Sequence, residues 1–450
     1  MTDFLDDDDR SGGPQPFVDT RPAPTRVGLI VPDVRGRVTS HAIEARKAEF
    51  EGLAQAIRVE MVFSEIVKVR EIKPATFIGG GHLEEIKKKV EEGKVELLLV
   101  DTALAPVQQR NLETETKAKV LDRTALILEI FGERAATREG VLQVELAHLN
   151  YQKSRLVRSW THLERQRGGF GFLGGPGETQ IESDRRLLEE RIKALEERLE
   201  KVKRTRGQQR GGREVVQIPV VALVGYTNAG KSSLFNRLTG AGVFAEDLLF
   251  ATLDTTLRKL ELPHGRDVMI SDTVGFVSEL PTTLVAAFRA TLEEVTGADV
   301  ILHVRDVANP DSAAQSADVL KVLTELGVSA EKTPIIEVWN KIDLLDEGRE
   351  VLQTLLPMGQ VAATVPVSAY TGEGTDKLLE AIEATLGKQS KTYKVRVPHT
   401  NGADVGWLYG HAEIIGKDEP DEEGQTYEVR VEPRHKASFT QRFAGRIETA

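Results

Sequence analysis

The chain of 450 residues contains no cysteine, which excludes disulfide frameworks, cysteine zinc sites, iron–sulfur clusters and thiolate catalysis. It also lacks any apolar run near the roughly 18 residues that a membrane span requires. The first ten residues, MTDFLDDDDR, are acidic, whereas a secretory signal begins with a basic region. The formal net charge is −11, and a general nucleic-acid coat protein is normally basic. We therefore expect a cytoplasmic protein with about three domains, each large enough to bury its own core.

The composition changes near residue 25. Residues 1–25 are acidic and rich in proline and glycine, which predicts a disordered leader and favours it over a functional acidic tail. Residues 26–136 alternate between apolar runs and charged segments, which predicts a small α/β domain. Its predicted elements are strands at Val27–Val31, Leu97–Val100 and Ala125–Phe131 and a helix from Ser40 to about Ala56.

Three consecutive glycines, Gly79 to Gly81, precede a predicted helix over Leu83–Val90. Glycines before a helix can cradle a phosphate, and they can equally form a flexible turn. The Gly-x-Gly-x-x-Gly spacing of a dinucleotide site is absent, which favours the turn.

Residues 137–213 predict two long helices that pair as an antiparallel hairpin, because apolar residues recur at heptad-like spacings in two stretches. These apolar positions are Leu142, Leu146, Leu149, Leu156, Trp160 and Leu163, and then Leu188, Ile192, Leu195, Leu199 and Val202. Between the stretches, Gly168–Gly177 holds six glycines in ten residues, with two phenylalanines. Thr179 and Glu182 form a capping box that restarts the helix.

Positive charge is concentrated on this hairpin. Residues 151–213 hold sixteen Lys and Arg against nine Asp and Glu, a balance of +7, so the rest of the chain carries −18. A basic run is often only a solvated helix face. Next to a tip with aromatic side chains, it also offers phosphate neutralisation together with base stacking. This combination favours an RNA contact.

A phosphate-binding loop follows the apolar strand predicted at Ile218–Val224. The sequence Gly-x-x-x-x-Gly-Lys-Ser stands between a strand and a helix, as a P-loop requires. Backbone N–H groups face the phosphates, Lys231 neutralises the β- and γ-phosphates, and the Ser232 hydroxyl can ligate Mg²⁺. The predicted loop residues are Gly225, Tyr226, Thr227, Asn228, Ala229, Gly230, Lys231, Ser232 and Ser233.

Three further motifs follow at the ends of predicted strands. Asp272 is expected to hold Mg²⁺, and the Gly275 N–H to reach the γ-phosphate. The Asp343 carboxylate can accept two hydrogen bonds from guanine, a pair of donors that adenine lacks. The motif residues are Asp272, Thr273, Val274 and Gly275, then Asn340, Lys341 and Asp343, and then Ser368, Ala369 and Tyr370, which cover the base. Their order predicts a GTP-binding α/β domain over residues 214–388, with a doubly wound, mostly parallel sheet.

A threonine that closes over Mg²⁺ should precede Asp272. The segment Phe250, Ala251, Thr252, Leu253 and Asp254 supplies Thr252, and the residues alone leave Thr255 and Thr256 as rivals. The predicted Mg²⁺ ligands are thus Ser232, Thr252 and Asp272.

Phe276 stands where small GTPases commonly place a glutamine that orients water. A phenylalanine cannot hydrogen-bond to water, so intrinsic hydrolysis should be slow or should depend on another group. Asn228 is either a helper that holds K⁺ or a turn-forming residue. The predicted catalytic set is Lys231, Thr252, Gly275 and Asn228.

Five ordered segments resemble the HflX family of ribosome-associated GTPases, within the Obg–HflX-like superfamily. They are QQRNLE (Gln108–Glu113), GGPGETQIESDRR (Gly174–Arg186), GYTNAGKSSLFN, FATLDTT and DTVGF. The resemblance covers nearly the whole chain after the leader. It implies that Thr252 senses Mg²⁺, that the protein binds the large ribosomal subunit and splits stalled ribosomes in the GTP state, and that its hairpin reaches toward the peptidyl-transferase centre.

Two segments depart from that family. The family more often has an arginine shortly before PGETQ, whereas this chain reads Phe172-Leu173-Gly174-Gly175, so the RNA contacts of the tip are expected to differ. The family's first glycine-rich segment usually contains a lysine, and here the glycines are followed by His82. This difference argues against ATP binding by the N-terminal domain.

Residues 391–450 predict a small α+β domain with β-rich segments at Thr392–Val397, Val405–Leu408 and Thr426–Val431. From Thr400 onward it holds ten acidic and six basic residues, which favours contact with protein over contact with RNA.

Taken together, these features predict a GTP hydrolase, monomeric when free, that docks on the large ribosomal subunit and separates subunits under stress. One alternative is a GTPase that acts in large-subunit assembly, and another is a switch in which GTP gates a protein partner. ATP-driven RNA remodelling is disfavoured because the Asn340-Lys341-Ile342-Asp343 motif selects guanine.

Overall fold

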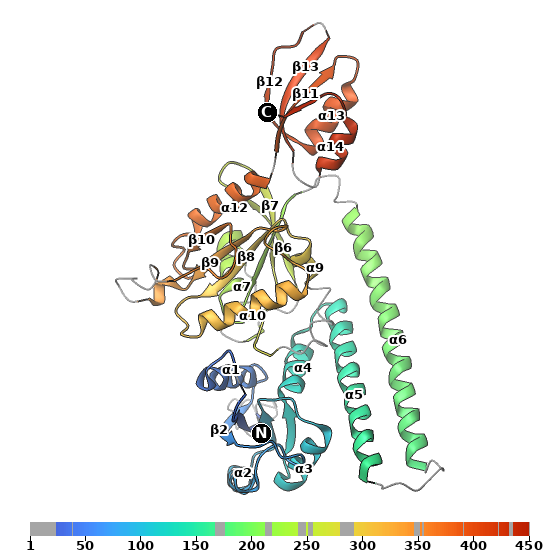
Figure 1. Cartoon of the computed structure of the whole chain (residues 1–450), viewed down its shortest axis with the longest axis vertical. Coiled ribbons are helices and arrows are strands. Elements are labelled where there is room, and N and C mark those ends of the chain that lie inside the picture. The colour runs from blue at the N-terminus through green and yellow to red at the C-terminus, as the bar shows by residue number, and fades with distance from the viewer. Residues whose placement is uncertain are drawn as a thin grey trace, which may run out of the picture.

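The computed structural model of the protein contains three β-sheets and a long helical arm (Figure 1). A four-stranded sheet comes first, followed by the arm, a six-stranded sheet and a second four-stranded sheet. Among the described residues, no helix is both long and apolar enough to cross a membrane. The structure describes residues 24–37, 39–166, 176–211, 218–241, 249–250, 255–279, 292–345, 352, 355–389, 391–421, 423–431 and 435–449. The predicted leader, up to residue 23, lies outside this set.

The first sheet is parallel, with the strand order β2-β1-β3-β4. Its elements are β1 (Arg26–Val34), α1 (Ile43–Gln55), β2 (Glu60–Val69), α2 (Gly80–Gly93), β3 (Leu97–Val100), α3 (Pro106–Thr116) and β4 (Lys119–Asp122). The strands predicted at Val27–Val31 and Leu97–Val100 are confirmed. The helix predicted from Ser40 begins at Ile43. Gly80 and Gly81 lie in the first turn of α2, so the glycines open the helix itself.

The strand predicted at Ala125–Phe131 is wrong, because this segment lies in α4 (Arg123–Arg134). The Asp122 carboxylate caps the helix by accepting a hydrogen bond from the Ala125 N–H at 2.9 Å. The apolar residues of the run are buried and Glu129 is exposed, and a short apolar run suits a buried helix as well as a buried strand.

The arm consists of α5 (Arg138–Gln166) and α6 (Pro176–Gly211), which run antiparallel (Figure 1). The helical hairpin is confirmed, and six of the predicted heptad positions form the seam between the helices: Leu149, Ile192 and Leu195 are buried, with Leu142, Leu146 and Leu188 packed around them. The side chains of Trp160 and Leu163 lie outside the described set. Helix α6 begins at Pro176, before the predicted start at Thr179. The glycine-rich tip from residue 167 to 175 and the side chains of the capping box lie outside the described set.

The second sheet has the strand order β10-β9-β8-β5-β7-β6, and every neighbouring pair is parallel except β6 with β7. Helix α10 packs on one face, and α7 and α12 pack on the other. This is the predicted doubly wound fold. Its elements are β5 (Val220–Gly225), α7 (Lys231–Thr239), β6 (Thr256–Glu261), β7 (Asp267–Asp272), α9 (Glu293–Thr296), β8 (Val300–Asp306), α10 (Ser312–Glu325), β9 (Ile335–Asn340), η2 (Ile342–Leu344), β10 (Ala363–Pro366) and α12 (Thr375–Gln389).

The third sheet is antiparallel, with the order β12-β13-β11-β14. Its elements are β11 (Lys391–Pro398), α13 (Gly402–His411), β12 (Glu413–Lys417), β13 (Gly424–Val431), α14 (Lys436–Arg442) and β14 (Ile447–Thr449). The β-segment predicted at Val405–Leu408 is wrong, because it lies in α13. Leu408 packs with Phe439 and Phe443 on the sheet, so tertiary packing outweighs the β propensity of a four-residue run.

The first two sheets share one apolar core, because residues of both belong to a single buried cluster. The rings of Phe131 on α4 and Phe250 meet edge to face, with centroids 4.6 Å apart. The carboxyl ends of the strands also face each other, since Arg123 directly after β4 bonds to Ser278 beyond β7. In parallel sheets, this edge is where ligands usually bind.

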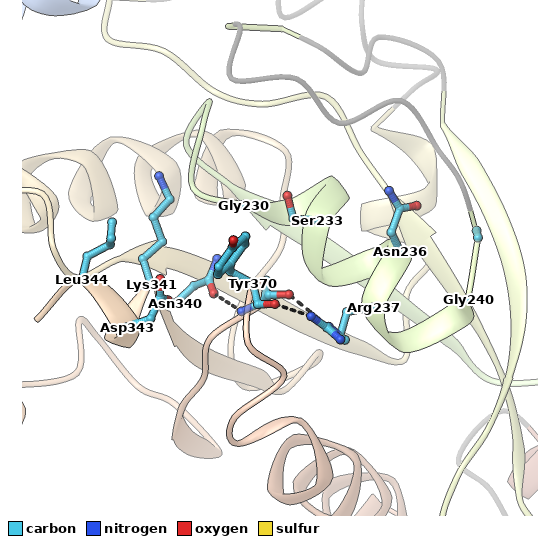
Figure 2. Close-up of a pocket in the computed structure, with 12 residues that line it drawn as sticks. Gly230, Ser233, Asn236, Arg237, Gly240, Asn340, Lys341, Asp343, Leu344 and Tyr370 are labelled. Atoms are coloured by element: carbon cyan, nitrogen blue, oxygen red, sulfur yellow. Dashed lines mark hydrogen bonds between the residues drawn. The ribbon is translucent and has the colours of Figure 1, made fainter.

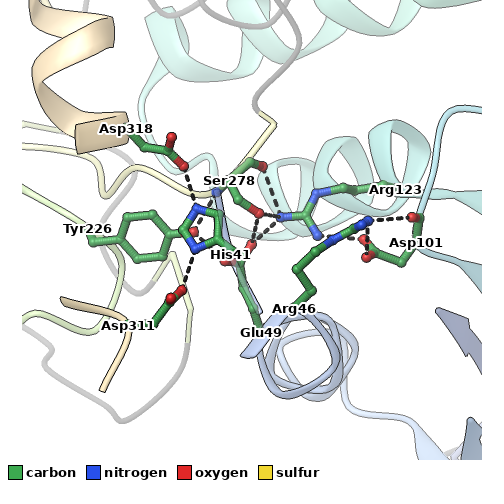
Figure 3. Close-up of polar contacts among 9 residues, drawn as sticks. All are labelled: His41, Arg46, Glu49, Asp101, Arg123, Tyr226, Ser278, Asp311 and Asp318. Carbon is green, nitrogen blue, oxygen red and sulfur yellow. Dashed lines mark hydrogen bonds and ion pairs between the residues drawn. The ribbon is translucent and has the colours of Figure 1, made fainter. Parts of the chain in front are cut away.

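His41, just before α1, links the first sheet and its helices to α10 of the second sheet near this edge (Figure 3); we call this contact the clamp. Its Nε2 lies 2.7 Å from the Asp318 carboxylate on α10, and its Nδ1 contacts the Asp311 carboxylate just before that helix. The hydrogen bond to Asp318, together with that to Asp311, raises the pKa of this buried imidazole to about 9, although burial opposes the shift.

The pKa of His41 predicts how the docking of the two units depends on pH. Because the folded value of about 9 exceeds the ordinary value of 6.5, protonated His41 contributes its full stabilisation below pH 6.5. The contribution falls as the pH rises and is lost above about pH 9. We expect the difference in unfolding free energy between wild type and His41→Gln to shrink over this range in urea titrations.

The exposed His399, in the turn directly after β11, supplies the matched control. His399→Gln should give a difference from wild type that does not follow this pH profile. A His41→Gln difference that is constant from about pH 6 to about pH 10 would contradict the clamp.

Candidate guanine-nucleotide site

The phosphate-binding loop joins β5 to α7. Gly230 has φ of +90°, and a Cβ at this position would lie 2.2 Å from Asn340 Nδ2, so both the backbone and the space require glycine. Asn228 is exposed and has φ of +59°, a left-handed conformation that asparagine tolerates better than most residues. That geometry fits a turn-forming Asn228 and leaves its side chain accessible.

Lys231 begins α7 and is buried under the loop. Its Nζ donates a hydrogen bond to the Tyr226 carbonyl oxygen at 2.8 Å. Burial lowers the pKa of Lys231 to about 8, and the charge of Asp272 only partly opposes this shift. Phosphate oxygens next to Nζ would restore the preference for the charged form.

The two predicted Mg²⁺ ligands from α7 and β7 already touch. Ser232 Oγ donates to Asp272 Oδ2 at 2.7 Å. A hydroxyl with one carboxylate suits Mg²⁺, which keeps several waters and also binds substrate phosphates. Across the described residues, no group of three or more His, Cys, Asp and Glu side chains could hold a metal ion by itself. The donor set therefore fits a metal bound jointly with a nucleotide.

The DxxG segment, Asp272 to Gly275, packs directly on the phosphate loop. The Thr227 N–H donates to the Phe276 carbonyl oxygen at 2.7 Å, and the Phe276 N–H donates to the Gly225 carbonyl oxygen at 3.2 Å. A Cβ at Gly275 would lie 2.7 Å from Thr227 Cγ2 and 3.0 Å from Lys231 Nζ. Phe276 is only 1 % exposed and belongs to the core shared with the first sheet, so its ring serves packing.

The predicted base-recognition residues surround a cavity of about 910 Å³ (Figure 2). Asn340 ties the loops together: its Nδ2 donates to the Ala229 carbonyl oxygen at 2.8 Å, and its Oδ1 accepts from the Ala369 N–H at 2.9 Å. Ser368 Oγ donates to Asp343 Oδ1 at 2.6 Å, which orients the carboxylate. Tyr370 is 83 % exposed.

Lys341 lines the same cavity, and its Nζ pairs with Asp306 at 2.9 Å. The loop of Ser368, Ala369 and Tyr370, which is expected to cover the base, is tied to Asn340 through the Ala369 N–H. The motifs are thus brought to one site, with Asn340 as their common link.

Thr252, the predicted Mg²⁺-sensing threonine, lies outside the residues that the structure describes, which include Phe250 but not 251–254. Of its rivals, Thr255 precedes β6, and Thr256 begins that strand opposite Asp272 in the antiparallel ladder. The choice of Thr252 thus stays a prediction.

Sequence reasoning missed Arg237 on α7. Its Nε donates to the Ala369 carbonyl oxygen at 3.2 Å, and its guanidinium also bonds to the Tyr370 carbonyl oxygen. These bonds hold the loop that covers the base (Figure 2). An arginine on an exposed helix face carries no local signal for a partner 132 residues away in sequence.

The guanine-selecting role of Asp343 predicts a change of base preference. Asp343→Asn replaces an acceptor-only carboxylate with an amide that also donates, so it should weaken GTP binding by about 100-fold or more, given roughly 1.5–3 kcal/mol for each of two charged hydrogen bonds. Xanthosine triphosphate should then bind better than GTP in competition titrations. Asp376→Asn, an exposed carboxylate on α12, should leave the preference unchanged, and a variant that still prefers GTP would refute the assignment.

Four family models match the chain in order. Their descriptions are "GTP-binding GTPase N-terminal" for residues 44–132, "GTP-binding GTPase Middle Region" for 134–213, "50S ribosome-binding GTPase" for 220–341 and "HflX C-terminal domain" for 357–449.

Curated relatives match over most of the chain. GTPase HflX of Magnetococcus marinus is 48% identical, covering 89% of this chain and 91% of that protein. GTPase HflX of Escherichia coli is 43% identical, covering 85% and 89%. A solved GTP-binding protein of the archaeon Sulfolobus solfataricus, in complex with GDP, is 25% identical with a TM-score of 0.42, covering 80% of this chain and 98% of that chain. From the identity and coverage of these HflX relatives, the chain belongs to the HflX family of GTPases.

Proposed function

We propose that this GTPase acts in the cytoplasm as a monomer, binds the large ribosomal subunit and splits stalled ribosomes. The observation that carries the proposal is a guanine-nucleotide site joined to a long basic helical arm in one chain. The description of the matched GTPase model, a 50S ribosome-binding GTPase, supports the same partner.

In the proposed site, Lys231 and the loop N–H groups stabilise the negative charge that develops on the transferred phosphoryl group. Gly225 to Ser233 wrap the phosphates, and the Gly275 N–H faces the γ-phosphate. Asp343 selects guanine, with Ser368 fixing its orientation at 2.6 Å.

Mg²⁺, when bound with the nucleotide, would supply positive charge that offsets the charge of the phosphates. Ser232 and Asp272 would hold it, together with Thr252. Ser232 Oγ and Asp272 Oδ2 lie 2.7 Å apart, so these two oxygens can reach the same ion, which supports the assignment.

Orientation of the attacking water needs a group other than Phe276, whose ring is buried in the shared core. Asn228 is exposed on the phosphate loop, so we propose it as a ligand for K⁺, whose charge can replace that of an arginine finger. The ribosome would order the remaining switch residues.

The arm supplies the proposed RNA contact, and its charges are distributed unevenly. Near the middle of the arm, basic side chains pair with acidic ones, as Arg185 does with Glu189 and Arg186 with Glu190. Excess positive charge lies in sequence at the two ends, next to the tip and from Lys201 to Arg213. A concentration of positive charge in the sequence beside the tip suits phosphate contacts.

The close packing of Gly275 predicts the effect of a methyl group. In Gly275→Ala, the new Cβ would lie 2.7 Å from Thr227 Cγ2 and 3.0 Å from Lys231 Nζ, so the loop must shift away from the γ-phosphate. We expect kcat for GTP to fall by about 100-fold or more, with GDP affinity nearly unchanged. Gly132→Ala, where a Cβ would meet no atom within 4 Å, is the control; retention of wild-type kcat in Gly275→Ala would contradict the proposed role.

Ribosome binding predicts a charge dependence that is specific to the tip. Arg165→Glu with Arg167→Glu should weaken co-sedimentation with large subunits in a non-hydrolysable GTP analogue by about 10-fold or more, and less so at high salt. Arg185→Glu with Arg186→Glu makes the same charge change where both arginines are paired, and should have a smaller effect.

Subunit splitting should require GTP or its analogue and should fail with GDP. Lys231→Ala should bind nucleotide poorly and should not split ribosomes. Absence of both co-sedimentation and splitting in the wild type would reject the ribosomal role, and binding confined to immature large subunits would indicate an assembly factor.

A further inference from the structure

The DxxG loop is bonded to the first sheet unit as well as to the phosphate loop. Ser278, just beyond the DxxG segment, is 2 % exposed. Its carbonyl oxygen and Oγ accept hydrogen bonds from the Arg123 guanidinium at 3.0 and 2.9 Å. Its N–H donates to the Tyr226 hydroxyl at 2.6 Å, and its Oγ lies 2.9 Å from Glu49 Oε1. Ser278, which must move with the nucleotide loops, is therefore held by Arg123 and Glu49 of the first domain (Figure 3).

Arg123 is the centre of a buried, charge-balanced cluster. It bonds to Asp101 at 2.7 Å and to Glu49, and Arg46 bonds to the other Asp101 oxygen at 2.7 Å. Burial opposes the charge of Arg123, yet Glu49 and Asp101 outweigh it and keep the pKa of the guanidinium above its ordinary value. The Tyr226 hydroxyl completes the cluster by donating to Glu49.

The neighbouring residue, Asp122, holds the arm. Its carboxylate accepts from the Tyr151 hydroxyl at 2.9 Å and from the Arg155 guanidinium at 3.2 Å, and both donors lie on α5. The same carboxylate caps α4 through the Ala125 N–H. Two adjacent residues thus face opposite ways, one toward the DxxG loop and one toward the arm.

We propose that Arg123 is a positioning residue that couples the DxxG loop, through Ser278, to the arm held by Asp122. Loss of a γ-phosphate releases the switch loops of GTPases, so Ser278 is displaced relative to Arg123 when the nucleotide changes. Because Arg123 and Asp122 share a peptide bond at the start of α4, that displacement is passed to α5. The proposal deepens the function proposed above, and it rests on that function only for what the arm contacts.

The coupling must work in both directions, because linkage between two sites is reciprocal. A partner that moves α5 would change the relative affinity for GTP and GDP by the same factor by which the nucleotide changes affinity for that partner. Arginine suits this position because its planar fork can bond Asp101 on one side and Ser278 on the other at the same time. A lysine ammonium is a single point charge and cannot.

Hydrogen exchange of the free full-length protein tests the coupling without ribosomes. In the wild type, exchange protection in α5 around Tyr151 should differ by about fivefold or more between GDP and a non-hydrolysable GTP analogue. In Arg123→Lys the difference should fall below about twofold. Arg46→Lys is the matched control: it alters an equally buried arginine whose described bonds go to Asp101, and it should keep the wild-type difference.

Ser278→Ala provides a second variant if Arg123→Lys does not fold. It removes the hydroxyl that contacts both Arg123 and Glu49 and leaves the buried charges paired. It should also reduce the nucleotide-dependent difference in α5, by about half or more. A wild-type α5 with equal protection in both nucleotides would overturn the proposal, as would full retention of the difference in both variants. Neither result bears on ribosome binding, so failure of the coupling is distinguishable from failure of the ribosomal role.

Discussion

Arg123 carries a buried positive charge at the point where two parallel sheets turn their carboxyl edges toward each other. Removing a guanidinium from water costs free energy. Burial of Arg123 is tolerated here because Asp101 and Glu49 neutralise its charge and Ser278 accepts hydrogen bonds from it. Deleting one of the charged partners leaves an uncompensated charge, which typically costs about 3–5 kcal/mol. The two domains are therefore bound by this charge-balanced cluster as well as by the apolar core that they share.

This arrangement gives the DxxG loop two neighbours. On one side the loop meets the phosphate loop through the bonds of Phe276 to Gly225 and Thr227. On the other side Phe276 and Ser278 are buried against the first domain. Phe276 packs in the core that the two domains share, so this position serves the interface between them. A side chain that faces this core is not available to orient water, which agrees with the expectation that hydrolysis depends on another group.

The sequence predicted the features that are local or periodic. The phosphate loop, the strand before it and the heptads of the arm depend on neighbouring residues, and the structure has them where expected. The strands predicted at Ala125–Phe131 and Val405–Leu408 are helices because short apolar runs have no measurable period, and a cap or a packing partner decides between the two forms. Arg237 and Arg123 could not be found this way, since their partners are 132 and 155 residues distant.

The segment QQRNLE, which contributed to the family resemblance, lies in α3 and contacts α5 more than halfway along that helix. Gln109 Nε2 donates to the Val120 carbonyl oxygen at 2.6 Å, and its Oε1 accepts from Arg155 on α5. Gln108 Nε2 donates a hydrogen bond to the Lys73 carbonyl oxygen at 3.1 Å. Gln109 thus ties β4, whose last residue is Asp122, to α5. A motif remote from the nucleotide holds the arm against the first domain, and a displacement at Asp122 can reach α5 only because β4 and α5 are joined in this way.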